Sequence, residues 1–256
     1  MNIRIEKQGR ITVITINRPT ARNAVDGPTA IQLADAFKAF DSDTESDVAI
    51  LTGANQSFCA GADLKAVATG DGNRVSIHGD GPMGPTRLLL SKPVIAAVEG
   101  HAVAGGLELA AWCDLRVAAE DAVFGVYCRR WGVPLVDGGT IRLTRLLGTS
   151  HAMDLILTGR GVSGTEALQM GLVNRLSRPG EALTDALSLA EQLCQFPQNC
   201  MRSDRMSAYK QWDQPLEQAL VQETEMGLAV IKSGETAAGA KRFAAGKGRH
   251  GDFNAI

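Results

Sequence analysis

The stretch GHAVAGGLELA, residues 100–110, joins an apolar strand at residues 94–98 to an apolar helix that we expect over residues 105–111. Its small residues allow a ligand to approach the backbone closely. The start of the helix adds N–H groups without intrahelical partners and the positive end of a dipole. The stretch therefore predicts a strand, a Gly-rich turn and a helix whose N-terminus can face a ligand.

A second segment of the same design precedes it. The sequence FCAGADL, residues 58–64, follows a short apolar strand at residues 47–52. Two small-residue loops that converge on one point would present main-chain N–H groups to a developing oxyanion. The pair predicts a site for a reaction that builds negative charge on an oxygen.

The remaining elements indicate an α/β protein. Alternating residues at 3–7 and 11–16 predict a β-hairpin, and residues 29–40 have helical spacing. Strands that alternate with helices favour crossover connections. Beyond about residue 140 helical segments dominate, at residues 140–147, 150–158, 181–196 and 214–231. We divide the chain into a core at residues 1–195 and a C-terminal helical region at residues 196–256.

Composition excludes several classes of protein. With 256 residues and 45% hydrophobic content the chain can bury one large core. A net charge of −2 gives neither the basic stripe of a nucleic-acid binder nor a polybasic membrane anchor. The N-terminus has no apolar signal segment, and we expect no membrane association and a cytoplasmic protein. The five cysteines form no CxxC pair and suggest free thiols, without a metal site.

Taken together in order, the motifs resemble the enoyl-CoA hydratase/isomerase (crotonase) superfamily. The resemblance covers roughly residues 3–180 without large gaps. It extends from the two Gly loops to NRP at residues 17–19, CDLRVA at 113–118, FG at 124–125, GGT at 138–140 and LTGR at 157–160. It implies a crotonase-like spiral of ββα units, followed by C-terminal helices that build trimers, often paired into hexamers.

The resemblance also implies a chemistry. The amides of Ala62 and Gly105 would form an oxyanion hole for a thioester carbonyl, and Glu108 matches one of two catalytic glutamates of the hydratases. A carboxylate in an apolar pocket has a raised pKa, which suits proton transfer near neutral pH. The alternative is that Glu108 only complements the helix dipole. An acyl-CoA lyase or isomerase that acts through a thioester enolate, with enoyl-CoA hydratase as the leading name, is the implied function.

Coenzyme A would enter as part of the substrate, with no separate cofactor. The residues that the resemblance assigns to binding it are Ala21, Arg22, Ala24, Ala60, Ala62, Asp63, Lys65 and Gly105.

The chain departs from the family at the second glutamate. An ungapped count from Phe124-Gly125 gives Cys128 there, and a thiol replaces a carboxylic acid poorly. We interpret Cys128 as a residue of the pocket wall, with Trp131 beside it. Asp137 is the nearest other carboxylate, either as an N-cap of the helix that follows or as a catalytic group. Arg129 and Arg130 could meet an acyl group, a phosphate, another subunit or solvent.

Several activities stay open at this point. Hydration with a reduced carboxylate set and double-bond isomerisation by Glu108 or Asp137 both fit. Isomerisation needs a single proton-shuttling base, so the loss at Cys128 affects it less. A thioester hydrolase would use the same oxyanion hole. A non-catalytic acyl-CoA binder is the rival of a different class, against which the retained Glu108 argues.

Overall fold

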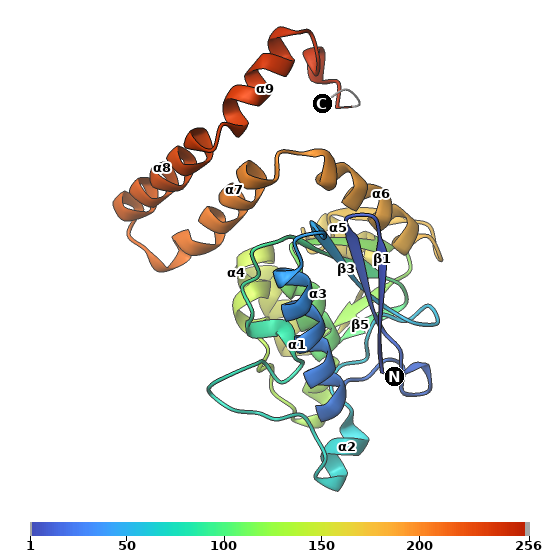
Figure 1. Cartoon of the computed structure of the whole chain (residues 1–256). Helices are drawn as coiled ribbons and strands as arrows, with labels where there is room; N and C mark the ends of the chain where they lie inside the picture. Colours follow the sequence, from blue (N-terminus) through green and yellow to red (C-terminus); the bar gives the residue numbers. More distant parts are fainter. Residues whose placement is uncertain (1, 254–256) are drawn as a thin grey trace. The chain divides into compact units, whose positions relative to one another are not determined.

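The computed structural model describes residues 2–253 and begins with the predicted hairpin (Figure 1). Strand β1 (Ile3–Gln8) pairs antiparallel with β2 (Ile11–Ile16), so that Ile3 lies opposite Ile16. Gly9 turns the chain between them with a φ of 57°, which glycine adopts at little cost. Every residue of β2 is buried, so β2 lies inside a sheet.

Within the described residues, six strands form the main sheet in the order β1-β2-β3-β4-β6-β9. All pairs after the hairpin are parallel. The added strands are β3 (Val48–Gly53), β4 (Val94–Val98), β6 (Leu115–Ala119) and β9 (Arg175–Ser177). Because β3 and β4 are parallel neighbours, the two Gly loops that follow them leave the same edge of the sheet.

A small second sheet corrects one expectation. The Gly-rich turn predicted after residue 98 contains a strand, β5 (His101–Val103), which pairs with β7 (Val123–Gly125). Strand β8 (Gly161–Ser163) completes this sheet. The three residues of β5 carry no strand pattern of their own, because their pairing partners come from distant parts of the chain.

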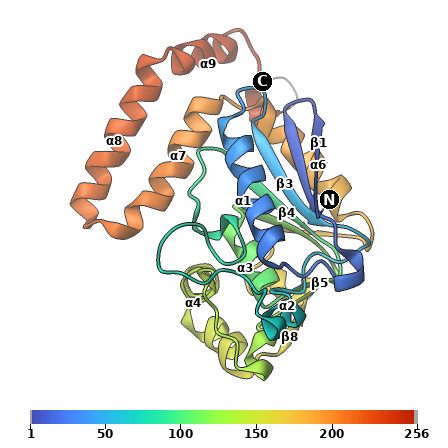
Figure 2. The ribbon, with the colours of Figure 1, turned by 60° about the horizontal axis from the view of Figure 1, so that its bottom comes forward.

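Helices cover the main sheet. Helix α1 (Gly27–Ser42) contains the predicted segment 29–40, and Asp26 caps it by accepting a hydrogen bond from the Thr29 N–H. Figure 2 shows α1 in front of β3 and β4. The others in this part are α2 (Leu64–Thr69), α3 (Gly105–Trp112), α4 (Gly139–Thr158), α5 (Gly164–Gln169) and α6 (Ala182–Gln195). Short 3-10 helices are η1 (Pro19–Ala21), η2 (Pro85–Arg87) and η3 (Tyr127–Trp131).

The chain divides into two compact units, one up to Ala190 and one from Glu191 onward. The second unit contains α7 (Gln198–Lys210), η4 (Gln211–Asp213), α8 (Leu216–Lys232), α9 (Glu235–Ala244) and η5 (Arg249–Gly251). Helix α7 was not expected from its sequence. The Glu235 carboxylate stabilises its start by accepting hydrogen bonds from the N–H groups of Asn199 and Cys200.

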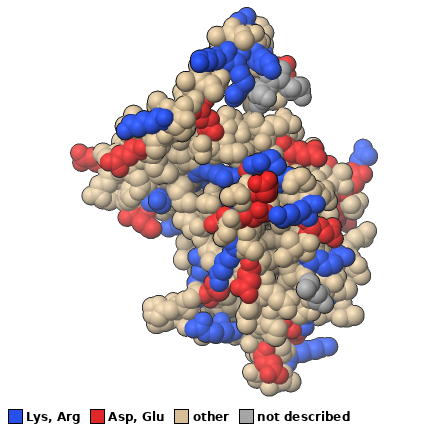
Figure 3. All heavy atoms as spheres, viewed as in Figure 1, with Lys and Arg blue, Asp and Glu red and all other residues tan. Residues whose placement is uncertain are grey.

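The surface and the helices give two further observations. Acidic and basic side chains are interspersed over the first unit on the face drawn in Figure 3. Among residues 2–253, none of the helices has the length and apolarity needed to cross a membrane.

Candidate active site

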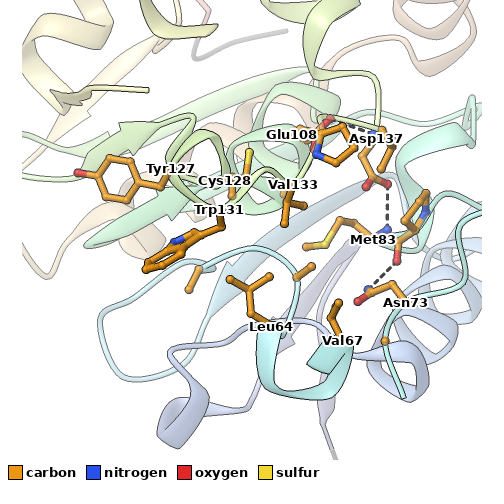
Figure 4. A pocket seen from close by; sticks show the side chains of 18 of the residues that line it. Leu64, Val67, Asn73, Met83, Glu108, Tyr127, Cys128, Trp131, Val133 and Asp137 are labelled. Atoms are coloured by element: carbon orange, nitrogen blue, oxygen red, sulfur yellow. Dashed lines mark hydrogen bonds between the residues drawn. The ribbon is translucent and has the colours of Figure 1, made fainter. Parts of the chain in front are cut away.

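A cavity of about 810 Å³ opens beside the start of α3 (Figure 4). Its wall comes from residues 60–75, 82–83, 101–108 and 127–137, with Arg22 at one side. Side chains on this wall are mostly apolar, and they include Leu64, Val67 and Val133. The site residues predicted from the sequence that line it are Arg22, Ala60, Ala62, Gly105, Glu108, Cys128, Trp131 and Asp137.

The two Gly loops meet at this cavity. The Cys59 N–H donates to the His101 carbonyl at 2.8 Å, and the Val103 N–H donates to the Cys59 carbonyl at 3.1 Å. Gly61 has a φ of 94°, and a Cβ atom added to it would lie 3.0 Å from the Gly105 nitrogen. Only glycine therefore lets the first loop approach the start of α3 so closely.

Two main-chain N–H groups at this junction are not used by the fold. Gly61 and Asp63 bond to Val25 on one side, so the N–H of Ala62 between them points to the other side. Gly105 is the first residue of α3, where an N–H has no intrahelical acceptor. Neither group donates a hydrogen bond to any atom of residues 2–253. Both residues line the cavity, so the pair is available to an oxygen bound there.

Glu108 supplies a carboxylate to the same cavity, and it is only 3% exposed. Its Oε1 accepts hydrogen bonds from the N–H groups of Asp137 at 2.9 Å and Gly139 at 2.8 Å. Burial, together with the nearby Asp137 carboxylate, raises the pKa of Glu108 to about 7, against the lowering effect of these two bonds. Such a group can both accept and release a proton near neutral pH.

This raised pKa predicts a pH-dependent effect of Glu108→Gln on stability. Between pH 4.5 and about 7 the folded carboxyl keeps a proton that the unfolded chain releases, so the wild type loses stability as pH rises. A pKa change from 4.5 to about 7 corresponds to roughly 3 kcal/mol. We expect the variant to gain up to that free energy of unfolding at pH 8 and little at pH 4. Urea unfolding at both pH values measures it, and an equal gain at both would contradict the assignment.

Asp137 does not cap the helix that follows it, which was one of the two roles considered for this residue. The N-cap of α4 is Gly138, and no side chain caps this helix, so the N-cap alternative for Asp137 is wrong. The backbone of Gly138, with a φ of 88°, starts the helix without it. Asp137 as a whole residue is 3% exposed. Its carboxylate accepts a hydrogen bond from the Met83 N–H at 2.8 Å, in the segment that precedes η2 (Figure 4).

Cys128 and its neighbours form one wall of the cavity. Cys128 is buried, and burial raises the pKa of its thiol, with a further rise from the Glu108 carboxylate. Trp131 lies at the rim with 67% of its surface exposed. Arg130 stacks over the Tyr127 ring at 4.5 Å and lines the cavity, whereas Arg129 donates to the Ile156 carbonyl. The thiol at residue 128 therefore leaves Glu108 and Asp137 as the carboxylates of this wall.

Comparisons with known proteins identify the family. A model of the family described as "Enoyl-CoA hydratase/isomerase" matches residues 6–250. The chain belongs to the enoyl-CoA hydratase/isomerase family. It is 36% identical over 250 residues to enoyl-CoA hydratase EchA19 of Mycobacterium tuberculosis, covering 94% of this chain and 92% of that protein. It is 41% identical over 196 residues to the carnitinyl-CoA dehydratase of Salmonella arizonae, covering 76% and 75% of the two chains.

Solved structures of the enoyl-CoA hydratase/isomerase family agree with this assignment. The enoyl-CoA hydratase EchA1 of Mycobacterium marinum superposes with a TM-score of 0.90 at 38% identity, covering 95% of this chain and 96% of that one. The carnitinyl-CoA hydratase of Mycobacterium avium gives a TM-score of 0.76 at 33% identity, with 95% of each chain covered. The predicted crotonase-like α/β fold is confirmed, whereas trimerisation through the C-terminal helices stays a prediction.

Four residues expected to bind coenzyme A do not line the cavity within the described part of the chain: Ala21, Ala24, Asp63 and Lys65. Asp63 caps α2 through bonds from the N–H groups of Lys65 and Ala66, and its other oxygen pairs with Arg18 at 3.0 Å. Arg18 also pairs with Asp26 at 2.7 Å. Asp63 thus holds the loop that carries Ala62, and Lys65 is exposed on α2.

Sequence reasoning missed part of the wall in this member of the family. Met83 is 1% exposed, and a Cβ atom added to Gly105 would lie 2.7 Å from its sulfur, so its side chain covers the start of α3. No motif around Met83 indicated this contact, which joins residues 22 positions apart. Among residues 2–253, no group of three or more His, Cys, Asp or Glu side chains is arranged to hold a metal ion.

Proposed function

We propose that the protein converts an acyl-CoA thioester through an enolate whose oxygen is bound by the N–H groups of Ala62 and Gly105. The observation that carries this proposal is the cavity that both N–H groups and the Glu108 carboxylate share. Two hydrogen bonds to the thioester oxygen acidify the α-carbon and make the β-carbon electrophilic. Loss of one such donor costs about 3–4 kcal/mol of transition-state stabilisation, so the pair would account for much of the rate.

Glu108 would move the proton in this reaction. Its raised pKa leaves a substantial ionised fraction at neutral pH, and the N–H groups of Asp137 and Gly139 hold its Oε1. Its second oxygen is then the one that reaches the substrate. Coenzyme A would arrive with the substrate, its phosphates near Arg22, and we expect no other cofactor. Arg22 is exposed at the cavity, with a φ of 50° set by the turn after η1.

Hydration of a 2-enoyl-CoA is the leading reaction, since relatives that share 36–41% of their residues with this chain are named enoyl-CoA hydratases. Isomerisation of a 3-enoyl-CoA is favoured by one specific observation, the thiol of Cys128 where the family resemblance implies a second carboxylate. A single base such as Glu108 suffices to move a double bond, whereas hydration also requires an oriented water.

Purified protein tests the function. Loss of the conjugated enoyl thioester absorbance with a 2-enoyl-CoA reports hydration, and its gain with a 3-enoyl-CoA reports isomerisation. Release of free coenzyme A thiol reports a hydrolase. Tight binding of several acyl-CoA esters without turnover of any of them would contradict the proposal and favour a non-catalytic acyl-CoA binder.

Cys128→Glu is predicted to change the balance between the two leading reactions. The variant restores a second carboxylate to the wall beside Glu108, where it can orient a water. We expect the ratio of hydration to isomerisation to rise about tenfold or more, because a placed general acid or base contributes at least this much. Cys128→Ser is the matched control, similar in size but without a carboxyl group. An unchanged ratio in Cys128→Glu would show that residue 128 does not reach the reacting carbons.

The second unit is proposed to assemble the protein into trimers, alone or paired into hexamers. Helix α8 exposes Leu216, Leu220 and Ile231 to solvent, with exposed fractions of 76%, 53% and 57%. Exposed apolar residues gathered on one helix are typical of an interaction surface. Light scattering coupled to size-exclusion chromatography measures the assembly, and a monomer at micromolar concentration would contradict it.

A further inference from the structure

The carboxylate of Asp137 is bonded to a segment that precedes it by about 50 residues. Its Oδ1 accepts hydrogen bonds from the Met83 N–H at 2.8 Å and from the Thr86 hydroxyl. Both donors are buried, with Met83 and Thr86 each 1% exposed. We propose that Asp137 is a positioning residue of this enzyme, which fixes residues 81–87 against the cavity and does not itself exchange protons with the substrate.

The surroundings of this oxygen support the proposal. A Cβ atom added to Gly81 would lie 2.9 Å from Asp137 Oδ1 and clash with the Thr86 hydroxyl, so the segment is packed directly onto the oxygen. The Arg142 side chain also connects the two segments, because it donates hydrogen bonds to the carbonyls of Asp137 at 2.7 Å and Thr86 at 2.6 Å. The two segments are therefore joined through both the side chain and the main chain of Asp137.

Asp137 thereby connects the two sides of the proposed reaction. Its N–H holds Glu108 Oε1, and its carboxylate holds the main chain of Met83. The Met83 side chain in turn covers Gly105, whose N–H is proposed to bind the thioester oxygen. One residue thus fixes the proton-transfer group and the cover of the oxyanion hole relative to each other. Figure 4 shows Asp137 between Glu108 and Met83.

A base and a positioning residue respond differently to substitution. An asparagine at residue 137 can still accept both hydrogen bonds through its amide oxygen, but it cannot take up a proton. Asp137→Ala loses both functions. The comparison of the two variants therefore separates the roles, and it rests on the proposed function only where turnover is measured.

Kinetics provide the first readout. We expect Asp137→Asn to keep kcat/KM within about threefold of wild type, because its amide oxygen preserves the two bonds. We expect Asp137→Ala to lose about tenfold to hundredfold, since small displacements of catalytic groups cost rates of that size. Thr86→Val, which removes the donor from the other side, should fall between them. The rise of kcat/KM with pH that ionisation of Glu108 should produce is expected to persist in all three variants.

Hydrogen exchange of residues 81–87 provides a readout that needs no turnover. In the wild type and Asp137→Asn the Met83 amide is expected to be protected, and in Asp137→Ala it should exchange about tenfold faster or more. Asp41→Asn is the matched control, because Asp41 Oδ1 also accepts one main-chain N–H and one hydroxyl, both from Ser91, away from the cavity. It should change neither exchange at residues 81–87 nor the kinetic constants.

Two results would overturn the proposal. One is an Asp137→Asn variant that folds, protects Met83 and yet loses activity as severely as Glu108→Gln, because that behaviour identifies a base. The other is unchanged exchange and unchanged kcat/KM in Asp137→Ala. A wild type without turnover of any acyl-CoA would instead defeat the proposed function, and the exchange experiment would still decide whether Asp137 holds the segment.

Discussion

Glu108→Gln is expected to lower kcat/KM by about 10²–10⁴, the contribution usual for a positioned general acid or base. The amide can keep the hydrogen bonds from Asp137 and Gly139, so the fold around it should persist. What the variant loses is the ability to exchange a proton with the substrate. Steady-state kinetics with whichever enoyl-CoA the wild type converts would measure the effect.

The pH profile of the same reaction should carry the signature of Glu108. Both isomerisation and water activation begin with the ionised carboxylate, so kcat/KM should rise with pH through about 7, the raised pKa of Glu108. This limb should be absent from the residual activity of Glu108→Gln. Asp41→Asn is the matched control, since Asp41 Oδ1 also accepts two hydrogen bonds that an amide oxygen can keep, from the N–H and the hydroxyl of Ser91, but Asp41 does not line the cavity. Equal losses in both variants would contradict a catalytic role for Glu108.

Gly106→Ala is expected to have the largest effect on the fold near the site. A Cβ atom at this second residue of α3 would lie 2.0 Å from the carbonyl oxygen of Cys59, which itself bonds to the Val103 N–H. The carbonyl carbon and oxygen of Cys59 belong to the main chain and cannot rotate away, so the loop at residues 58–64 must shift. We expect a loss of about 3 kcal/mol in the free energy of unfolding, at the upper end of overpacking costs.

The same shift should also reduce activity. Cys59 lies three residues before Ala62 and bonds to His101 and Val103, so its position determines how close the Ala62 N–H comes to the Gly105 N–H. Chemical unfolding and kcat/KM with the converted enoyl-CoA measure the two effects. Gly239→Ala in α9 is the control, since the atom nearest to its added Cβ is the flexible end of Arg242 at 3.9 Å and an alanine stabilises a helix interior by about 0.5–1 kcal/mol. A stable and fully active Gly106→Ala would show that the loops do not need this close approach.

The parts of the site that could be predicted from the sequence are those whose residues lie close together along the chain. Residues 100–110 contain a glycine-rich loop, a helix start and Glu108 together, so their relation follows from helix geometry alone. The meeting of this stretch with residues 58–64 could be expected once both were seen to follow strands. Parallel pairing of β3 and β4 then brings the two loops to one edge of the sheet.

The parts that sequence missed depend on contacts between distant residues. Thr86 and Met83 bond to Asp137 across about 50 positions, and neither carries a local pattern that indicates a partner. The N-cap alternative for Asp137 was wrong because its carboxylate accepts hydrogen bonds from the buried Met83 N–H and Thr86 hydroxyl instead of from the N-terminus of α4. Helix α7 has a polar sequence without a clear apolar stripe, and its N-terminal N–H groups are satisfied by Glu235, 35 positions later.

The route of residues 70–80 has a consequence for how such a cavity can diversify. These residues form neither helix nor strand, yet Gly72, Asn73 and Val75 supply part of the cavity wall. Doubling the length of a flexible loop costs only about 0.6 kcal/mol of closure entropy. Insertions and deletions there can therefore give the cavity a new shape while the sheet edge that holds Ala62 and Gly105 stays as it is. The shape of the cavity and its two main-chain N–H groups are therefore encoded in separate stretches of the chain.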